Sequence, residues 1–236
     1  MNSRTLKIII PASIGQVESS LDLPIELLSN PEYEIRGLAL VSHPNPLMGG
    51  TKDNKVVQTL ARALNQLGYI SLRPNFRGIG ETTGTHDDGL GESSDIYEVV
   101  EWMRNPDSWA SHEELRGYPW LKTVRDLPLV LAGFSFGTYV SSLVCKRLLD
   151  EGQDVERLVL VGSATSKWTL PKVPANTILI HGERDETILL KSVFDWAAPQ
   201  ELAVSVIPEA DHFFHRKLHC IRDIVIRSWE GQPRVR

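Results

Sequence analysis

The fold is most clearly predicted by the stretch Leu129-Val130-Leu131-Ala132-Gly133-Phe134-Ser135-Phe136-Gly137. An apolar run leads into the pattern Gly-x-Ser-x-Gly, and apolar residues at helical spacing follow over 138–149. A strand, a sharp turn and a helix in this order hold a serine in a strained conformation, with its hydroxyl above the sheet. Neighbouring chain passes so close to such a turn that glycine, which has no Cβ, is needed on both sides. The pattern predicts that Ser135 is a nucleophile, provided that the chain supplies a base and an acid.

The composition is that of an ordinary folded protein. The chain has 236 residues, of which 42% are hydrophobic and 23% are charged, and this is typical of one globular domain. A net charge of −5 argues against a nucleic-acid surface. The apolar stretch within residues 1–11 is too short for a signal peptide, and no segment has the length of a membrane span. We therefore expect one domain over residues 1–236, in the cytoplasm, that binds neither nucleic acid nor membrane.

Strands and helices are predicted to alternate from residue 36 onward. The predicted strands are 36–42, 69–74, 129–133, 158–161, 177–180 and 203–207. The predicted helices are 55–67, 94–103, 138–149, 188–196 and 218–229. Nearly continuous apolar runs are typical of strands that are covered on both faces. The alternation predicts an α/β fold with a mostly parallel central sheet and helices on both faces, in three layers.

Two segments fall outside this alternation. Residues 1–30 are predicted to contribute two N-terminal strands, 6–10 and 16–28. Residues 106–126 have no clear period and are predicted to be an insertion with one helical turn at 111–116. We expect this insertion to form either one wall of the site or a contact surface on the helix side.

Two loops that follow later strands carry acids and histidines. The loop 181–186 follows one predicted strand and the loop 208–214 follows another, so both face the same edge of the sheet as Ser135. A serine hydroxyl is a weak nucleophile until a base takes its proton, and a carboxylate must hold that base in the right tautomer. The loops supply both groups in the chain order serine, acid, histidine, which is the order of a known hydrolase triad.

More than one residue competes for each role. The candidate acids are Asp185, Glu183, Glu186 and Asp211, and the candidate bases are His212 and His215. His212, His215 and His219 also lie at a spacing that suggests a metal site. No fourth ligand at zinc spacing accompanies them, so we expect no metal. His43 and His181 end predicted strands, and we expect them to shape loops by hydrogen bonding.

Five motifs in order resemble a known superfamily. They are His43-Pro44-Asn45-Pro46-Leu47-Met48-Gly49-Gly50-Thr51, Asn75-Phe76-Arg77-Gly78-Ile79-Gly80, residues 133–137, residues 181–186 and Asp211-His212-Phe213-Phe214. Over residues 36–219 the chain is similar to the α/β-hydrolase superfamily, and within it to small lidless hydrolases related to the dienelactone hydrolases. The resemblance implies the α/β-hydrolase fold and a triad of Ser135, Asp185 and His212. Dienelactone hydrolases use a cysteine nucleophile, so Ser135 argues against that reaction.

The resemblance also implies an oxyanion hole made of two backbone N–H groups. One belongs to Phe136, the residue after the nucleophile, and the other comes from the loop after Ser42. Pro44 and Pro46 have no N–H, so Asn45 between them is the expected donor.

We expect a serine hydrolase of the carboxylesterase type (EC 3.1.1), which cleaves an ester of a small soluble molecule through an acyl-enzyme without cofactor or metal. The connection 163–175, where larger relatives insert a cap, is short and predicts an open site. Two alternatives stay open: an aminopeptidase or amidase with the same triad, and a catalytically silent member of the fold that binds a ligand.

Overall fold

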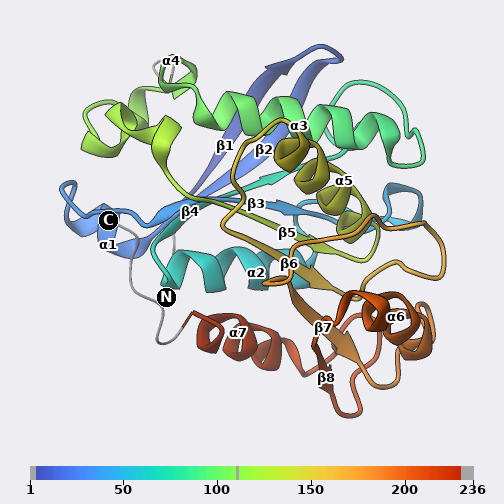
Figure 1. Cartoon of the computed structure of the whole chain (residues 1–236). Coiled ribbons are helices and arrows are strands. Elements are labelled where there is room, and N and C mark those ends of the chain that lie inside the picture. The colour runs from blue at the N-terminus through green and yellow to red at the C-terminus, as the bar shows by residue number, and fades with distance from the viewer. Residues whose placement is uncertain (1–3, 110–111, 230–236) are drawn as a thin grey trace.

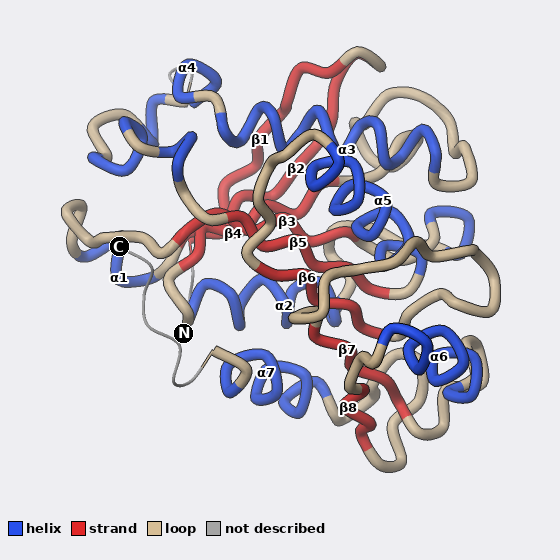
Figure 2. The backbone as a smooth tube through the Cα atoms, viewed as in Figure 1, coloured by secondary structure: helices blue, strands red, loops and turns tan. Residues whose placement is uncertain are grey.

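One sheet of eight strands forms the centre of the computed structural model, which describes residues 4–109 and 112–229 (Figures 1 and 2). The strands lie in the order β1-β2-β4-β3-β5-β6-β7-β8. Strand β2 runs antiparallel to both of its neighbours, and every other neighbouring pair is parallel. The strand bounds are β1 Arg4–Ala12, β2 Gly15–Leu23, β3 Gly37–Ser42, β4 Tyr69–Pro74, β5 Leu129–Phe134, β6 Arg157–Val161, β7 Ile178–Gly182 and β8 Val204–Ile207.

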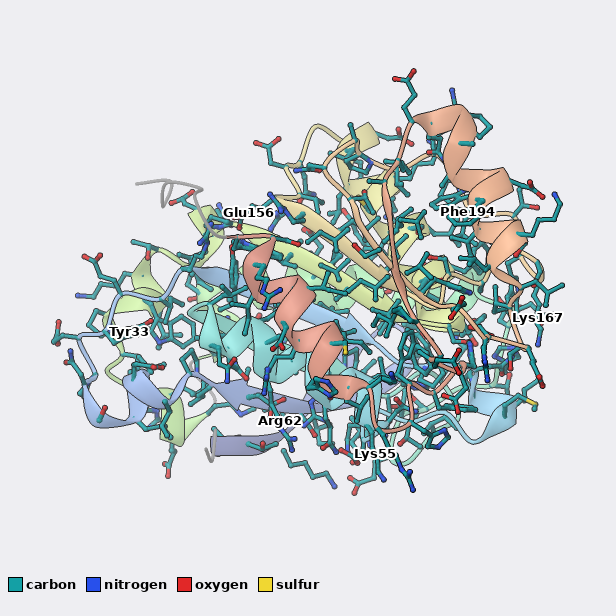
Figure 3. All side chains as sticks on the ribbon, turned by 90° about the horizontal axis from the view of Figure 1, so that it is seen from below. Tyr33, Lys55, Arg62, Glu156, Lys167 and Phe194 are labelled. Atoms are coloured by element: carbon teal, nitrogen blue, oxygen red, sulfur yellow. The ribbon has the colours of Figure 1, made fainter. Side chains whose placement is uncertain are left out.

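Helices cover both faces of this sheet. Helices α3 and α5 lie over one face, and α2 and α7 lie side by side over the other, as the view from below also shows (Figures 1 and 3). The helix bounds are α1 Ile25–Ser29, α2 Lys55–Gln66, α3 Leu90–Arg104, α4 Pro106–Trp109, α5 Phe136–Asp150, α6 Leu190–Ala197 and α7 Leu218–Arg227. The predicted fold class, a mostly parallel sheet between two helical layers, is confirmed.

The central strands are largely apolar because both of their faces are buried. In β3, Leu38 and Leu40 belong to the core cluster on the α3 and α5 side. Ala39 and Val41, which alternate with them, belong to the cluster under α2 and α7. Side chains of a strand point to opposite faces in turn, so a continuous apolar run supplies two cores at once.

The second N-terminal strand is shorter than predicted. Strand β2 ends at Leu23, and the short helix α1 occupies residues that were expected to continue the strand to position 28. Pro24 lies between them with φ −52° and ψ 140°. Proline has no N–H to donate to a strand ladder, and it is well suited to precede or open a helix.

Residues 106–126 pack into the core rather than forming a wall of the predicted site. Besides α4 they contain three 3₁₀ turns: η2 Glu113–Leu115, η3 Pro119–Lys122 and η4 Val124–Asp126. Of the predicted turn at 111–116, residue 111 lies outside the described residues. Four side chains of the segment are buried in the core cluster that also contains residues of α3: Trp109, Leu115, Trp120 and Val124. The segment joins the C-terminus of α3 to the start of β5, which places it at the edge of the sheet opposite Ser135.

The strand order creates a topological switch point at the carboxyl edge. After β3 the chain forms α2 on one face, and after β5 it forms α5 on the other (Figure 1). Because β3 and β5 are neighbours, the loops that follow them separate at this point of the edge. Ligands of open parallel sheets bind at the carboxyl edge, beside such a switch point.

Candidate active site

Ser135 sits on a strained turn directly between β5 and α5. Its φ of 53° and ψ of −121° lie outside the regions that a non-glycine residue readily adopts. A Cβ on Gly133 would lie 2.2 Å from the carbonyl oxygen of Gly137, and a Cβ on Gly137 would lie 2.3 Å from that of Ser42. Both glycines are therefore required by the close approach of the backbone.

Ser135, Asp185 and His212 lie together at the carboxyl edge, although they come from three loops. The Ser135 hydroxyl lies 3.0 Å from Nε2 of His212, and Nδ1 of His212 lies 2.7 Å from Oδ2 of Asp185. Oδ1 of Asp185 accepts the backbone N–H groups of Thr187 and Ile188 at 2.9 and 2.8 Å. The three side chains are nearly buried. A carboxylate on Nδ1 keeps the proton there and leaves Nε2 free to accept the serine proton.

The competing acids and bases point elsewhere. Glu183 and Glu186 are exposed. Asp211 bonds to Nδ1 of His215 at 2.6 Å, and the His215 side chain is 73% exposed. Among the described residues, none of these four forms a hydrogen bond with Ser135 or His212. No group of three or more His, Cys, Asp or Glu side chains in the described part of the chain could hold a metal ion.

His181 supports the loop that carries Asp185. Its ring is fully buried, and burial lowers its pKa, so the ring is neutral. Nε2 donates its proton to the carbonyl oxygen of Ile188 at 2.9 Å. This bond joins the two ends of the loop that contains Asp185, as expected for a histidine that shapes a loop.

The loop that carries Asn45 begins at the elbow, where a Cβ on Gly137 would meet the carbonyl oxygens of Ser42 and His43. Asn45 has φ −52° and ψ 122°, an extended conformation of the kind that a following proline favours. Its side-chain Oδ1 accepts the N–H of Leu47 at 2.8 Å, and its carbonyl accepts those of Met48 and Gly50. The backbone N–H groups of Asn45 and Phe136 form no hydrogen bond with any described residue. Within the described part of the chain, both predicted oxyanion donors are thus left without an acceptor.

His43 fixes the peptide group to which the Asn45 N–H belongs. Its ring lies 2.7 Å from the Pro44 carbonyl through Nδ1, and Nε2 lies 2.9 Å from the N–H of Phe76. A carbonyl only accepts and an N–H only donates, so the ring carries its proton on Nδ1. Complete burial lowers the pKa of His43 to about 3, which keeps the ring in this neutral form. The Pro44–Asn45 peptide is therefore held from its carbonyl side.

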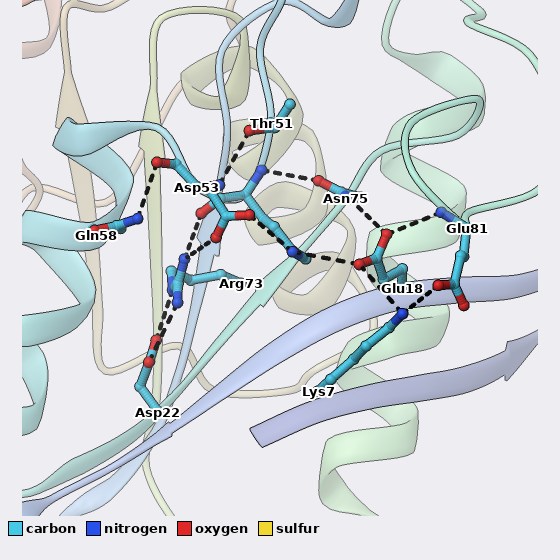
Figure 4. A network of polar contacts seen from close by, with 10 residues as sticks. Lys7, Glu18, Asp22, Thr51, Asp53, Gln58, Arg73, Asn75 and Glu81 are labelled. Carbon is cyan, nitrogen blue, oxygen red and sulfur yellow. Dashed lines mark hydrogen bonds and ion pairs between the residues drawn. The ribbon is translucent and has the colours of Figure 1, made fainter. Parts of the chain in front are cut away.

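A buried polar network supports the chain that follows this loop (Figure 4). Nε of Arg73, on β4, bonds to Asp22 of β2 at 2.6 Å, and Nη1 bonds to the carbonyl oxygen of Lys52 at 2.6 Å. The N–H of Lys52 donates to Oδ1 of Asn75 at 2.9 Å, and its ammonium group lies 3.4 Å from Glu18. Nothing in the sequence analysis indicated this network. Its signal in the sequence is the presence of charged residues, Glu18, Asp22 and Arg73, among the apolar residues of β2 and β4.

Comparisons with known proteins identify the fold. No family model matches the chain. A serine hydrolase without a lid from Xanthomonas campestris is 29% identical, with a TM-score of 0.78 over 99% of both chains. An α/β serine hydrolase homologue from Coxiella burnetii is also 29% identical, with a TM-score of 0.75 over 96% of this chain and 98% of its own. The chain belongs to the α/β-hydrolase superfamily.

An uncharacterized protein from Rickettsia prowazekii resembles this α/β hydrolase in sequence, with 27% identity over 76% of this chain and 73% of its own. The connection between β6 and β7, where larger relatives carry a cap, contains no helix or strand in this α/β hydrolase. Within the described ranges, none of its helices is long and apolar enough to cross a membrane.

Proposed function

We propose that this α/β hydrolase is a serine hydrolase of the carboxylesterase type (EC 3.1.1) that acts on small esters. The observation that supports it most is the pair of hydrogen bonds that runs from Ser135 through His212 to the buried carboxylate of Asp185. A histidine held in this way removes the serine proton as the hydroxyl attacks. Without such a base, a serine hydroxyl is a weak nucleophile at neutral pH. The similarity to two solved serine hydrolases agrees with this proposal.

The reaction proceeds in two halves. Oγ of Ser135 bonds to the ester carbonyl carbon while Nε2 of His212 takes its proton, and the carbonyl oxygen becomes an oxyanion that accepts the N–H groups of Phe136 and Asn45. The C–O bond to the alcohol then breaks, and His212 returns the proton to the leaving oxygen. A water molecule then attacks the acyl carbon while His212 takes its proton. The bond between the acyl carbon and Oγ of Ser135 breaks, His212 returns the proton to Oγ, and the acid leaves. Neither half requires a cofactor or a metal.

A fluorophosphonate probe tests the nucleophile. We expect the probe to modify Ser135, and Ser135→Ala to abolish both labelling and ester cleavage while circular dichroism stays unchanged. Ser163→Ala is the matched control, because Ser163 is also buried at the end of a strand but its hydroxyl has no partner among the described residues. An adduct that mass spectrometry places on Ser42, Ser71 or Ser163 would refute the assignment.

A substrate panel separates the two alternatives from this proposal. We expect p-nitrophenyl esters to be cleaved with a higher kcat/KM than aminoacyl anilides. A preference for anilides would replace the esterase with an aminopeptidase or amidase. A folded protein in which Ser135 takes no label would instead be a silent member of the fold that binds its ligand.

A further inference from the structure

The most exposed large apolar side chains of the described residues gather near the candidate active site. Their exposed fractions are 70% for Leu47, 84% for Met48, 66% for Leu90, 61% for Leu189 and 50% for Phe213. The other exposed large apolar side chains of the described residues are at most 45% exposed, as Phe194 on α6 is (Figure 3). Single exposed apolar residues are normal on a surface, but a concentration of them marks a binding site.

All five follow the carboxyl end of a strand in the parallel part of the sheet. Leu47 and Met48 come after β3, Leu90 after β4, Leu189 after β7 and Phe213 after β8. The carboxyl ends of the parallel strands β3, β4, β7 and β8 lie at one edge of the sheet, which is also the edge of Ser135. Four separate loops thus carry apolar side chains to the same end of the molecule.

Two of these loops also supply groups of the site itself. Phe213 follows His212 directly, and the two rings lie 5.2 Å apart between centroids in an edge-on arrangement. Leu47 donates its N–H to the side chain of Asn45 at 2.8 Å, and Met48 donates to the carbonyl of the same residue. The Phe213 ring is therefore next to the base, and the backbone of Leu47 and Met48 is bonded to the residue of one predicted oxyanion donor.

The other two loops contact the site through the residue before the apolar one. The residue that precedes Leu189 donates its N–H to Asp185 at 2.8 Å. Gly89, which precedes Leu90, packs so closely that a Cβ on it would lie 3.4 Å from the ring of Phe136. The four loops that carry the five apolar residues thus contact the site at the base, the acid and both predicted oxyanion residues.

We propose that Leu47, Met48, Leu90, Leu189 and Phe213 form an apolar rim that binds the aliphatic chain of an amphiphilic ester. This inference rests on the proposed function, because it assigns a chain to the ester that Ser135 cleaves. The five residues carry no charge, so they themselves offer a substituent only apolar surface. With no helix or strand between β6 and β7 to cover the edge, a chain on the rim keeps one side in water.

The rim predicts a dependence on chain length. A methylene group that leaves water completely strengthens binding about fourfold, and one that lies on an open rim is worth about twofold. The six methylenes that separate acetate from octanoate then raise kcat/KM on the order of 50-fold. Binding of a chain that does not react changes KM rather than kcat.

The experiment measures kcat/KM for monomeric p-nitrophenyl acetate, butyrate, hexanoate and octanoate, and for acetate esters of alkyl alcohols of the same lengths. The two series show whether the acyl or the alcohol chain lies on the rim. We expect Met48→Gln and Leu189→Gln each to lower the ratio of octanoate to acetate at least threefold. Leu149→Gln is the matched control, because Leu149 is 42% exposed at the C-terminal end of α5, away from the rim. Its ratio should equal that of the wild type.

Three other outcomes would overturn the rim. One is a flat dependence on both chains in a protein whose Ser135 takes the fluorophosphonate label, and it leaves the proposed function intact. Another is an equal fall of the ratio in Leu149→Gln. The third combines two results: Ser135→Ala sediments with phosphatidylcholine vesicles, and the wild type shows no chain-length effect on monomeric esters. It would assign the apolar residues to binding of a lipid surface. Failure of the proposed function itself is distinct, since then neither labelling nor cleavage occurs.

Discussion

Exchanging the amide of Asn45 for an ester deletes one N–H and tests the oxyanion hole. The N–H forms no hydrogen bond with any described residue, so the native fold loses no such bond with it. The loss of the donor should raise the barrier to the step in which the oxyanion forms. One oxyanion donor is worth about 10²–10³ in kcat, or roughly 3–4 kcal/mol. The peptide is held by His43, which bonds to the Pro44 carbonyl at 2.7 Å, so no neighbouring N–H swings in to replace the lost one.

The comparison variant is Asn45→Ala, for which the opposite result is expected. The Asn45 side chain caps the turn η1 (Pro46–Met48) by accepting the N–H of Leu47, so its removal costs about 1 kcal/mol of stability. For a chain of this size, that lowers Tm by about 2–4 °C. The backbone N–H remains, and we expect kcat to fall less than about tenfold, well short of the loss of a donor.

The assay is single-turnover acylation by a p-nitrophenyl ester, with the ester analogue made by nonsense suppression with an α-hydroxy acid. Circular dichroism and a thermal melt accompany each variant. The reasoning is refuted if the alanine variant loses the acylation rate while the ester variant keeps it. In that case the side-chain amide of Asn45, rather than its backbone, would be the donor.

Three further predictions concern the acid of the triad, the buried ring of His43 and the polar network. Asp185→Asn should lower kcat by about 10⁴, because His212 would take the wrong tautomer, whereas Glu183→Gln should leave kcat within a few-fold; equal losses would misplace the acid. The pKa of His43 is lowered to about 3, so between about pH 6.5 and 3 the unfolded chain binds a proton that the native state does not. The free energy of unfolding should therefore decrease as the pH is lowered through this window, with a loss of about 2 kcal/mol at pH 5 from this residue. Urea titrations that show no such loss would contradict a neutral buried ring. Arg73→Met should cost about 3–5 kcal/mol by leaving Asp22 charged and buried, and Asp22→Leu in the same chain should restore much of it; a double variant as unstable as the single one would show that the pair is not the cause.

The sheet was predictable from the sequence because its pattern is local. A strand that is buried on both faces favours apolar residues on both, and β5 and the residues of β3 up to Val41 follow this pattern. Residues 106–126 were harder, because four helical pieces of three or four residues leave no period to detect. Their place in the core follows from Trp109 and Trp120, whose rings lie edge-on 5.4 Å apart, and from the contact of Trp109 with Trp102 of α3. A single domain over residues 1–236 and a cytoplasmic location stay predictions.

The three side chains of the candidate triad were named from the sequence, but their selection among neighbours was not. Glu183, Asp185 and Glu186 are chemically alike and lie in one loop. Which of them turns inward depends on Asp185 accepting two N–H groups of its own loop and on His181 closing that loop from beneath. No periodicity records such bonds, and here the family resemblance supplied the choice.

The geometry of the site depends on backbone contacts at least as much as on side-chain bonds. A Cβ on Gly137 would overlap the carbonyl of Ser42, and one on Gly182 would lie 2.5 Å from the carbonyl of Ala210. The first contact joins the elbow to the loop of Asn45, and the second joins the loops of Asp185 and His212. One added methyl group at either glycine would force two of these loops apart without touching a reacting atom. A misplacement of about 1 Å costs on the order of 10²-fold in rate, so these glycines determine the activity through the distances that they permit.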